Sequence, residues 1–113
     1  MALNVLLLGS GGREHAIAWR LAQSPLLGRL TIAPGNAGTA AYGENIDARI
    51  AEPDAVLALA ERVRADLVIV GPEDPLAAGV ADRLAAAGVP VFGPSRAAAE
   101  IEWSKAYAKQ LMH

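Results

Sequence analysis

The 113-residue sequence predicts an α/β fold in three layers, in which a mainly parallel sheet of about four to five strands lies between helices. Two observations carry this prediction. Short apolar runs alternate with longer segments of helical periodicity along the chain, as in repeated strand–helix–strand units. From Val5 to Leu8 the first of these runs is continuously apolar rather than alternating, which is typical of a parallel strand buried on both faces.

The first half of the chain holds two predicted strands and one predicted helix. Residues 3–8 form an apolar run that ends at a glycine, and residues 13–23 have the composition of a helix. A second strand is expected over 29–33, where Pro34 stops it. The residues that follow, up to Glu52, are rich in Gly and Ala and are expected to be mostly loop.

The second half repeats the alternation of helix and strand. Pro53 is a good first helical residue and is followed by a single apolar stripe, and residues 67–70 form a third strand. Asp74 can cap the next helix, which is expected to end at Gly88, and residues 89–92 form the fourth strand. The residues predicted to face the core from these two helices are Ala55, Val56, Leu59, Ala60, Val63, Leu76, Ala77, Val80, Ala81 and Leu84.

The composition excludes several classes of protein. Lys and Arg total 10 and Asp and Glu total 12, so the formal net charge is −2 and nucleic-acid binding is not expected. The absence of Cys excludes disulfide scaffolds, thiolate zinc sites and cysteine nucleophiles. The N-terminus lacks the basic region of a signal peptide, and no stretch approaches the ~20 apolar residues that span a membrane. We expect one soluble, cytoplasmic domain without a membrane partner.

Three loops at the carboxyl ends of predicted strands indicate a ligand site. They are residues 9–15, 34–36 and 71–73, and ligands of open parallel sheets bind beyond these strand ends. In the first loop, glycines allow close approach of a ligand, and the following helix directs free N–H groups and its positive dipole end toward an anion, most often phosphate. Gly and Pro can also simply end strands, but three such loops at one edge favour a site. Its candidate residues are Gly9, Ser10, Gly11, Gly12, Arg13, Glu14, His15, Pro34, Gly35, Asn36, Gly71, Pro72 and Glu73.

The phosphate compound is not expected to be a nicotinamide dinucleotide. The dinucleotide fingerprint needs a third glycine where this chain has Glu14, and an acidic residue after the second strand, where none occurs before Glu44. A small phosphorylated ligand remains. Arg13 could contact it through charge-assisted hydrogen bonds, while Asn36 and Glu73 could bind hydroxyls of a sugar.

Two site residues have an alternative structural role, and no catalytic group is evident. His15 could be a packed or capping histidine as readily as a ligand contact, and Glu14 would only offset the helix dipole if it pointed to solvent. The sequence has no recognisable nucleophile–base pair, no paired histidines for a metal and no Walker-type lysine after the glycines. The residues by themselves predict a binding domain.

Taken in order, the motifs closely resemble the N-terminal domain of the phosphoribosylamine–glycine ligase family, also called glycinamide ribonucleotide synthetase. The resemblance implies a Rossmann-like (pre-ATP-grasp) substrate-binding domain over residues 1–100. It also implies a helical lead-in over 101–113, after a cap at Ser95, to an ATP-grasp domain of the same protein that this chain lacks. The motifs that carry the resemblance are Gly9–His15, Ala33–Thr39, Val70–Leu76, Phe92–Ser95 and Ser104–Ala106.

The resemblance also implies a reaction. The family is an ATP-dependent carbon–nitrogen ligase of de novo purine biosynthesis that activates glycine as an acyl phosphate, which the amine of 5-phosphoribosylamine attacks, with magnesium assisting. By this resemblance Gly9–Gly12 would hold the 5-phosphate, residues 34–36 and 71–73 would line the ribose site, and Lys105 would be the early lysine that reaches ATP. The other ATP and Mg sites would lie outside this chain, so the isolated chain is expected to be inactive and at most to bind the phosphoribosyl substrate.

Two alternatives accompany the resemblance, and the chain departs from the family pattern in two ways, in lacking the ATP-grasp region and at Trp103. The alternatives are a free-standing Rossmann-type module that binds a nucleotide or phosphosugar, and the N-terminal domain of another ATP-grasp ligase. Continuation of the coding sequence past His113 would favour the ligase over a free-standing module. Trp103 stands where the family leads us to expect a glycine. Trp103 also begins a stripe with Tyr107 and Leu111, expected either to pack on the sheet or to be exposed for self-association.

Overall fold

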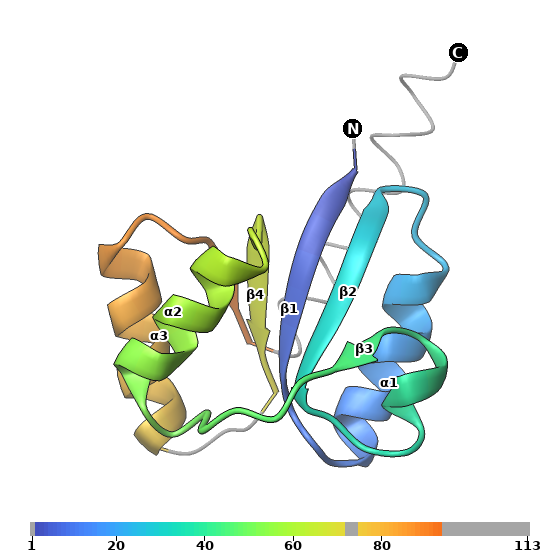
Figure 1. The fold of residues 1–113 in the computed structure, drawn as a ribbon, viewed down its shortest axis with the longest axis horizontal. Helices are drawn as coiled ribbons and strands as arrows, with labels where there is room; N and C mark the ends of the chain where they lie inside the picture. The colour runs from blue at the N-terminus through green and yellow to red at the C-terminus, as the bar shows by residue number, and fades with distance from the viewer. Residues whose placement is uncertain (1, 72–74, 94–113) are drawn as a thin grey trace.

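The structure, a computed structural model, describes residues 2–71 and 75–93 and contains a five-stranded sheet between helices (Figure 1). The predicted α/β fold is confirmed. Within these residues no helix is long and apolar enough to cross a membrane. The elements are β1 (Leu3–Gly9), α1 (Gly12–Ala22), β2 (Leu27–Pro34), the 3-10 helix η1 (Thr39–Ala41), β3 (Glu44–Asn45), α2 (Pro53–Arg62), β4 (Leu67–Val70), α3 (Pro75–Ala86) and β5 (Val91–Phe92).

The sheet has the strand order β3-β2-β1-β4-β5, and every pairing is parallel. The first strand of the chain therefore lies at its centre, where Leu6 pairs with Thr31 on one side and with Val68 on the other. Residues 5–9 of β1 are buried, as the continuous apolar run predicts. Because all the strands are parallel, their carboxyl ends lie at one edge, at the foot of the sheet in Figure 1.

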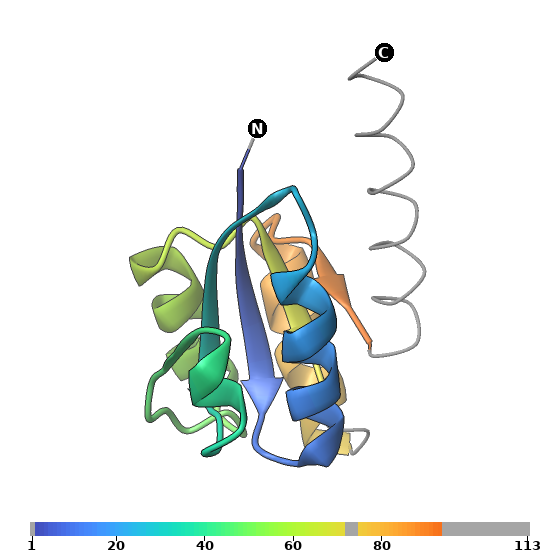
Figure 2. The same ribbon diagram turned by 90° about the vertical axis from the view of Figure 1, so that its right-hand side faces the viewer.

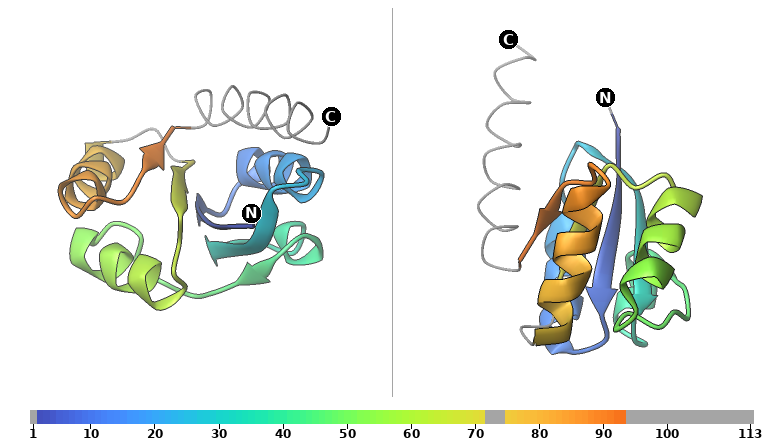
Figure 3. Two further views of the ribbon diagram at one scale, coloured as in Figure 1. Left: turned by 90° about the horizontal axis from the view of Figure 1, so that it is seen from above. Right: turned by 90° about the vertical axis from the view of Figure 1, so that its left-hand side faces the viewer.

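Each face of the sheet packs against its own helix layer. Figures 2 and 3 show α1 on one side of the sheet and α2 with α3 on the other. Alternate residues of β1 divide between the two layers, since Leu6 and Leu8 pack toward α2 and α3 whereas Val5 and Leu7 pack toward α1. Burial of these side chains on both faces is what holds the three layers together.

Two strands differ from expectation. Residues 44 and 45, predicted as loop, form the edge strand β3 by pairing with Thr31 and Ile32. The last strand covers only 91–92 instead of 89–92. The N–H of Val89 turns back to the carbonyl of Leu84, and Pro90, which has no N–H, reaches β4 only through its carbonyl, which accepts from the N–H of Val68 at 2.9 Å. β4 has the predicted bounds, and the bounds of β1, α1 and β2 differ from the predicted ones by at most two residues at either end.

Several predictions lie outside the described residues. They concern the cap at Asp74, the inward side chains of Leu76 and Ala77, and the C-terminal part, with its cap at Ser95, the lead-in over 101–113 and the stripe that Trp103 begins. Among the other residues predicted to face the core from α2 and α3, Val56, Leu59, Ala60, Val80 and Leu84 are buried, whereas Ala55, Val63 and Ala81 are half-buried.

Candidate functional site

An open pocket of about 320 Å³ lies at the carboxyl edge of the sheet, between the end of β1 and the end of β4. This is the edge at which ligands of open parallel sheets bind, and the edge that the sequence predicts. The pocket is lined by residues 9–14 of the first predicted loop and by Gly71, the first residue of the predicted loop over 71–73. The lining residues are Gly9, Ser10, Gly11, Gly12, Arg13, Glu14, Ile50 and Gly71.

The glycine loop, residues 9–12, joins the central strand directly to α1. Gly11 occupies the N-cap position in an extended conformation, and no side chain caps the helix. The first bond of the helix runs from the N–H of His15 to the carbonyl of Gly11, so the N–H groups before His15 have no helical partner. The pocket thus lies at a helix end that offers free donors and a positive partial charge.

Glu14 is buried beneath the glycine loop, with 5% of its surface exposed. A methyl group at Gly71 would lie 2.6 Å from Oε1 of Glu14 and 2.8 Å from the carbonyl oxygen of Leu8. A side chain at Gly9, whose φ is +133°, would also collide with the Glu14 carboxylate. Glycine at these two positions makes room for Glu14. The role in which Glu14 points to solvent and only offsets the helix dipole is therefore wrong.

The room that Glu14 needs does not explain why residues 11 and 12 are glycines. A methyl group at Gly12 would meet nothing within 4 Å, and one at Gly11 would meet only Oε2 of Glu14, at an ordinary 3.6 Å. Both residues line the pocket. The absence of side chains here leaves open space on the pocket side that the packing of the chain does not require.

Asn36 holds the glycine loop through hydrogen bonds to the carbonyl groups of the loop. Its Nδ2 donates hydrogen bonds to the carbonyl oxygens of Ser10, at 2.9 Å, and Gly11, at 3.1 Å. Its Oδ1 accepts from the N–H of Thr39 at 3.0 Å, and its own N–H donates to Oγ1 of Thr39 at 2.8 Å. Asn45 closes the cluster, because its Nδ2 donates to the carbonyl of Asn36 at 2.8 Å and its Oδ1 accepts from Thr39.

The direction of these bonds orients the loop. In a trans peptide the N–H points opposite to the carbonyl. Since the carbonyls of Ser10 and Gly11 are directed at Asn36, the N–H groups of Gly11 and Gly12 are directed away from it. Asn36 is not among the residues that line the pocket, and its side chain holds the glycine loop.

Arg13 and His15 lie on different sides of the loop. Nη1 of Arg13 donates to the carbonyl of Gly71 at 3.4 Å, which joins the first loop to the end of β4. The His15 ring packs against Gly38 and lies 5.8 Å from the ring of Tyr42, at an angle of 32°. His15 is exposed and is not among the residues that line the pocket, so its role in the site stays a prediction.

The remaining predicted site residues are only partly brought to the pocket. Pro34 and Gly35 lie beside the glycine loop, since Pro34 pairs with Gly9 and the N–H of Gly35 donates to the carbonyl of Gly9 at 3.0 Å. Ile50 lines the pocket but was missed, because an isolated apolar residue in a predicted loop gives no signal of a site. Pro72, Glu73 and Lys105 lie outside the described residues.

Among the residues that the structure describes, no cluster of His, Asp or Glu could hold a metal ion. Residues 3–102 match the family described as "Phosphoribosylglycinamide synthetase, N domain". The chain is 55% identical over 107 residues to a phosphoribosylamine–glycine ligase of Caulobacter vibrioides, which covers 95% of this chain and 25% of that protein. It is 55% identical over 109 residues to one of Mesorhizobium japonicum, covering 96% of this chain and 26% of that one.

A crystal structure of phosphoribosylamine–glycine ligase from Thermotoga maritima is also similar, with a TM-score of 0.49 and 34% identity over 63% of this chain and 16% of that chain. The chain spans about a quarter of the length of the two bacterial relatives.

Proposed function

The chain belongs to the family of phosphoribosylglycinamide synthetase N domains, and from this membership and the pocket we propose that it binds the sugar phosphate substrate, 5-phosphoribosylamine, of a phosphoribosylamine–glycine ligase. Membership of this family decides against the N-terminal domain of a different ATP-grasp ligase. The observation that carries the proposal is the glycine loop, residues 9–12, which opens on the pocket with free N–H groups at the start of α1.

The 5-phosphate is proposed to bind at the glycine loop. The N–H groups of Gly11 and Gly12 are directed away from Asn36, and neither residue has a side chain to obstruct an anion. Ser10, exposed at the rim, can add a hydroxyl donor. Backbone donors and a helix dipole favour a dianion without a Walker-type lysine, so a phosphate monoester fits this end of the pocket.

The sugar is proposed to extend from the loop toward β4. Gly71 and Ile50 line that side, and the apolar Ile50 side chain suits the face of a ribose ring. The predicted contacts from Pro72 and Glu73 continue from Gly71 in sequence. Asn36, predicted to bind a ribose hydroxyl, is instead proposed to position the loop, since its side chain already holds Ser10 and Gly11.

The ligase reaction itself is proposed for the whole protein, as one step of purine biosynthesis. It joins glycine to 5-phosphoribosylamine with ATP and magnesium, and the residues described here include no acidic cluster for the metal. We assign the ATP and magnesium sites to an ATP-grasp domain beyond this chain, with Lys105 as an early contact. The chain alone is expected to release no ADP in the presence of glycine, ATP and phosphoribosylamine.

Calorimetric titration with ribose 5-phosphate, a stable stand-in for the labile amine, tests the binding proposal. Gly11→Val should abolish binding, because valine adopts the extended N-cap conformation readily but places two methyl groups in the path of the phosphate. Gly79→Val is the matched control. Gly79 is an exposed helical glycine of α3 with nothing within 4 Å of an added methyl group, and it does not line the pocket.

The expected result is binding by the parent chain and by Gly79→Val, and none by Gly11→Val. If Gly11→Val bound ribose 5-phosphate as the parent does, the phosphate site would have to lie elsewhere. If the folded parent bound no ribose 5-phosphate at millimolar concentration, the proposal would fail for this chain.

A further inference from the structure

Glu14 combines two properties that its place in the fold does not require. Only 5% of its surface is exposed. Among the described residues, none donates a hydrogen bond to its carboxylate or forms an ion pair with it. Among the described residues, every fully buried side-chain nitrogen or oxygen has a hydrogen-bond partner. Because the Glu14 oxygens have none, they are not fully buried and remain accessible, and Glu14 is one of the residues that line the pocket.

We propose that Glu14 binds a hydrogen-bond donor, a hydroxyl or an ammonium group, carried by the same molecule whose phosphate is held at the glycine loop. This inference rests on the proposed function and adds a second contact in the same pocket. The N–H groups of Gly11 and Gly12 supply donors, and the carboxylate of Glu14, which lies against Gly9 and Gly71 and has no hydrogen-bond partner among the described residues, supplies an acceptor beside them.

The chemistry of a carboxylate makes the pocket selective. An ionised carboxylate only accepts hydrogen bonds, and it repels a second anion across a short distance in a partly enclosed site. Inorganic phosphate therefore gains the loop contacts but meets an unfavourable charge at Glu14. A phosphate ester that also carries a hydroxyl or ammonium group gains the contacts with the loop N–H groups and the hydrogen bond to Glu14. A pyrophosphate would place its second anionic group toward the carboxylate, in agreement with the failed dinucleotide fingerprint.

The placement of Gly9 and Gly71 supports a role for the carboxylate in the pocket. Both are occupied by glycine where any side chain would displace the Glu14 carboxylate. The glycine that ends β1 and the glycine that follows β4 thus surround one acid that has no hydrogen-bond or ion-pair partner within residues 2–71 and 75–93. A group that served packing alone would be apolar or paired, because an unpaired buried charge is unfavourable.

The test is titration of the parent chain and of Glu14→Gln with three probes: inorganic phosphate, ribose 5-phosphate and 2-aminoethyl phosphate. Gln has the shape of Glu without its charge. Phosphate should bind Glu14→Gln about threefold more tightly, because the repulsion is gone. At least one donor-bearing probe should bind about tenfold more weakly, because a charge-assisted hydrogen bond is lost. Weakening of ribose 5-phosphate identifies a hydroxyl partner, and weakening of 2-aminoethyl phosphate alone identifies an ammonium partner.

Glu61→Gln is the control for net charge, since Glu61 is an exposed glutamate on α2 that does not line the pocket. It should leave the affinities for all three probes unchanged. If Glu14→Gln shifted all three probes in the same direction, or none of them, Glu14 would have no part in recognition and the inference would be overturned while the phosphate site stood. If the folded parent bound none of the probes, the proposed function would fail and this inference with it.

Discussion

Replacing Asn36 with alanine should loosen the glycine loop and lower the stability of the domain. The change removes the hydrogen bonds to the carbonyls of Ser10 and Gly11 and leaves the N–H of Thr39 without its acceptor. The two carbonyl bonds are exposed, so each contributes about 0.5 kcal/mol. Thr39 is fully buried, and its unsatisfied N–H costs about 1 kcal/mol or more.

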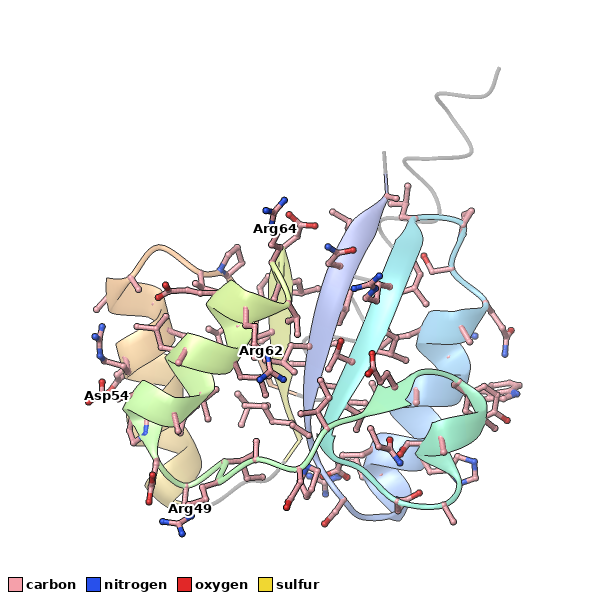
Figure 4. All side chains as sticks on the ribbon, in the orientation of Figure 1. Arg49, Asp54, Arg62 and Arg64 are labelled. Atoms are coloured by element: carbon pink, nitrogen blue, oxygen red, sulfur yellow. The ribbon has the colours of Figure 1, made fainter. Side chains whose placement is uncertain are left out.

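The expected loss is therefore about 2 kcal/mol, which lowers the melting temperature of a domain of this size by about 8 °C or more. Thermal unfolding followed by circular dichroism measures it. Asn4→Ala is the matched control. Asn4 lies at the opposite edge of the sheet, where its side chain donates one exposed bond, at 3.3 Å, to the carbonyl of Arg64, which Figure 4 labels. That variant should melt within about 3 °C of the parent, since a single exposed bond contributes about 0.5 kcal/mol.

Two measurements decide the interpretation of Asn36. Affinity for ribose 5-phosphate should fall in Asn36→Ala because the N–H groups of Gly11 and Gly12 lose their fixed direction, and it should not change in Asn4→Ala. If Asn36→Ala melted with the control, the hydrogen bonds to the loop would contribute nothing, and the reasoning from their geometry would be refuted. If it melted early but bound ribose 5-phosphate normally, Asn36 would stabilise the fold without positioning the site.

Three further substitutions test the backbone, each by urea denaturation with an unchanged m-value. Gly79→Ala should raise the free energy of unfolding by about 0.5–1 kcal/mol, because Gly79 is an exposed residue inside α3, where alanine has the higher helix propensity. A decrease would show that the added methyl group meets an unrecognised contact. Arg64→Gly should raise the free energy of unfolding by about 0.5 kcal/mol, because Arg64 follows the C-cap of α2 with a φ of +54°, where glycine is unstrained. Equal stability would show that the arginine side chain compensates. Gly71→Ala should lower the free energy of unfolding by about 2 kcal/mol or more, because the methyl group meets Glu14 and a backbone carbonyl, and no loss would mean that Glu14 moves aside at no cost.

The order of the central strands and helices could be predicted because it depends on local pattern. Apolar runs and helical stripes identify β1, β4, α2 and α3 directly from the sequence. The edge strand β3 could not be predicted in this way. Glu44 and Asn45 have little tendency to form strands, and they pair with Thr31 and Ile32 only because the edge of β2 is otherwise open. Propensity is here overridden by the available partner.

The candidate site divides similarly. Its position could be predicted, because glycines after parallel strands must meet at one edge. The roles of individual residues could not. The hydrogen bonds of Asn36 reach Ser10 across 26 positions of sequence, and the burial of Glu14 depends on Gly9, at the end of β1, and on Gly71, which follows β4. Such relations arise only when the sheet has assembled, so sequence spacing carries no trace of them.

The hydrogen bonds of the glycine loop explain how a run of flexible residues can be held in one conformation. A run of glycines loses more conformational freedom on folding than other residues, and the loss must be offset by contacts. Here the contacts are made on the carbonyl side, by Asn36, and its own place is fixed by Thr39 and Asn45. On the amide side, no described residue accepts a hydrogen bond from the N–H groups of Gly11 and Gly12. The carbonyl groups of these two peptides therefore fix the conformation of the loop, while their N–H groups remain available for the proposed anion. The proposed site is thus organised before a ligand binds.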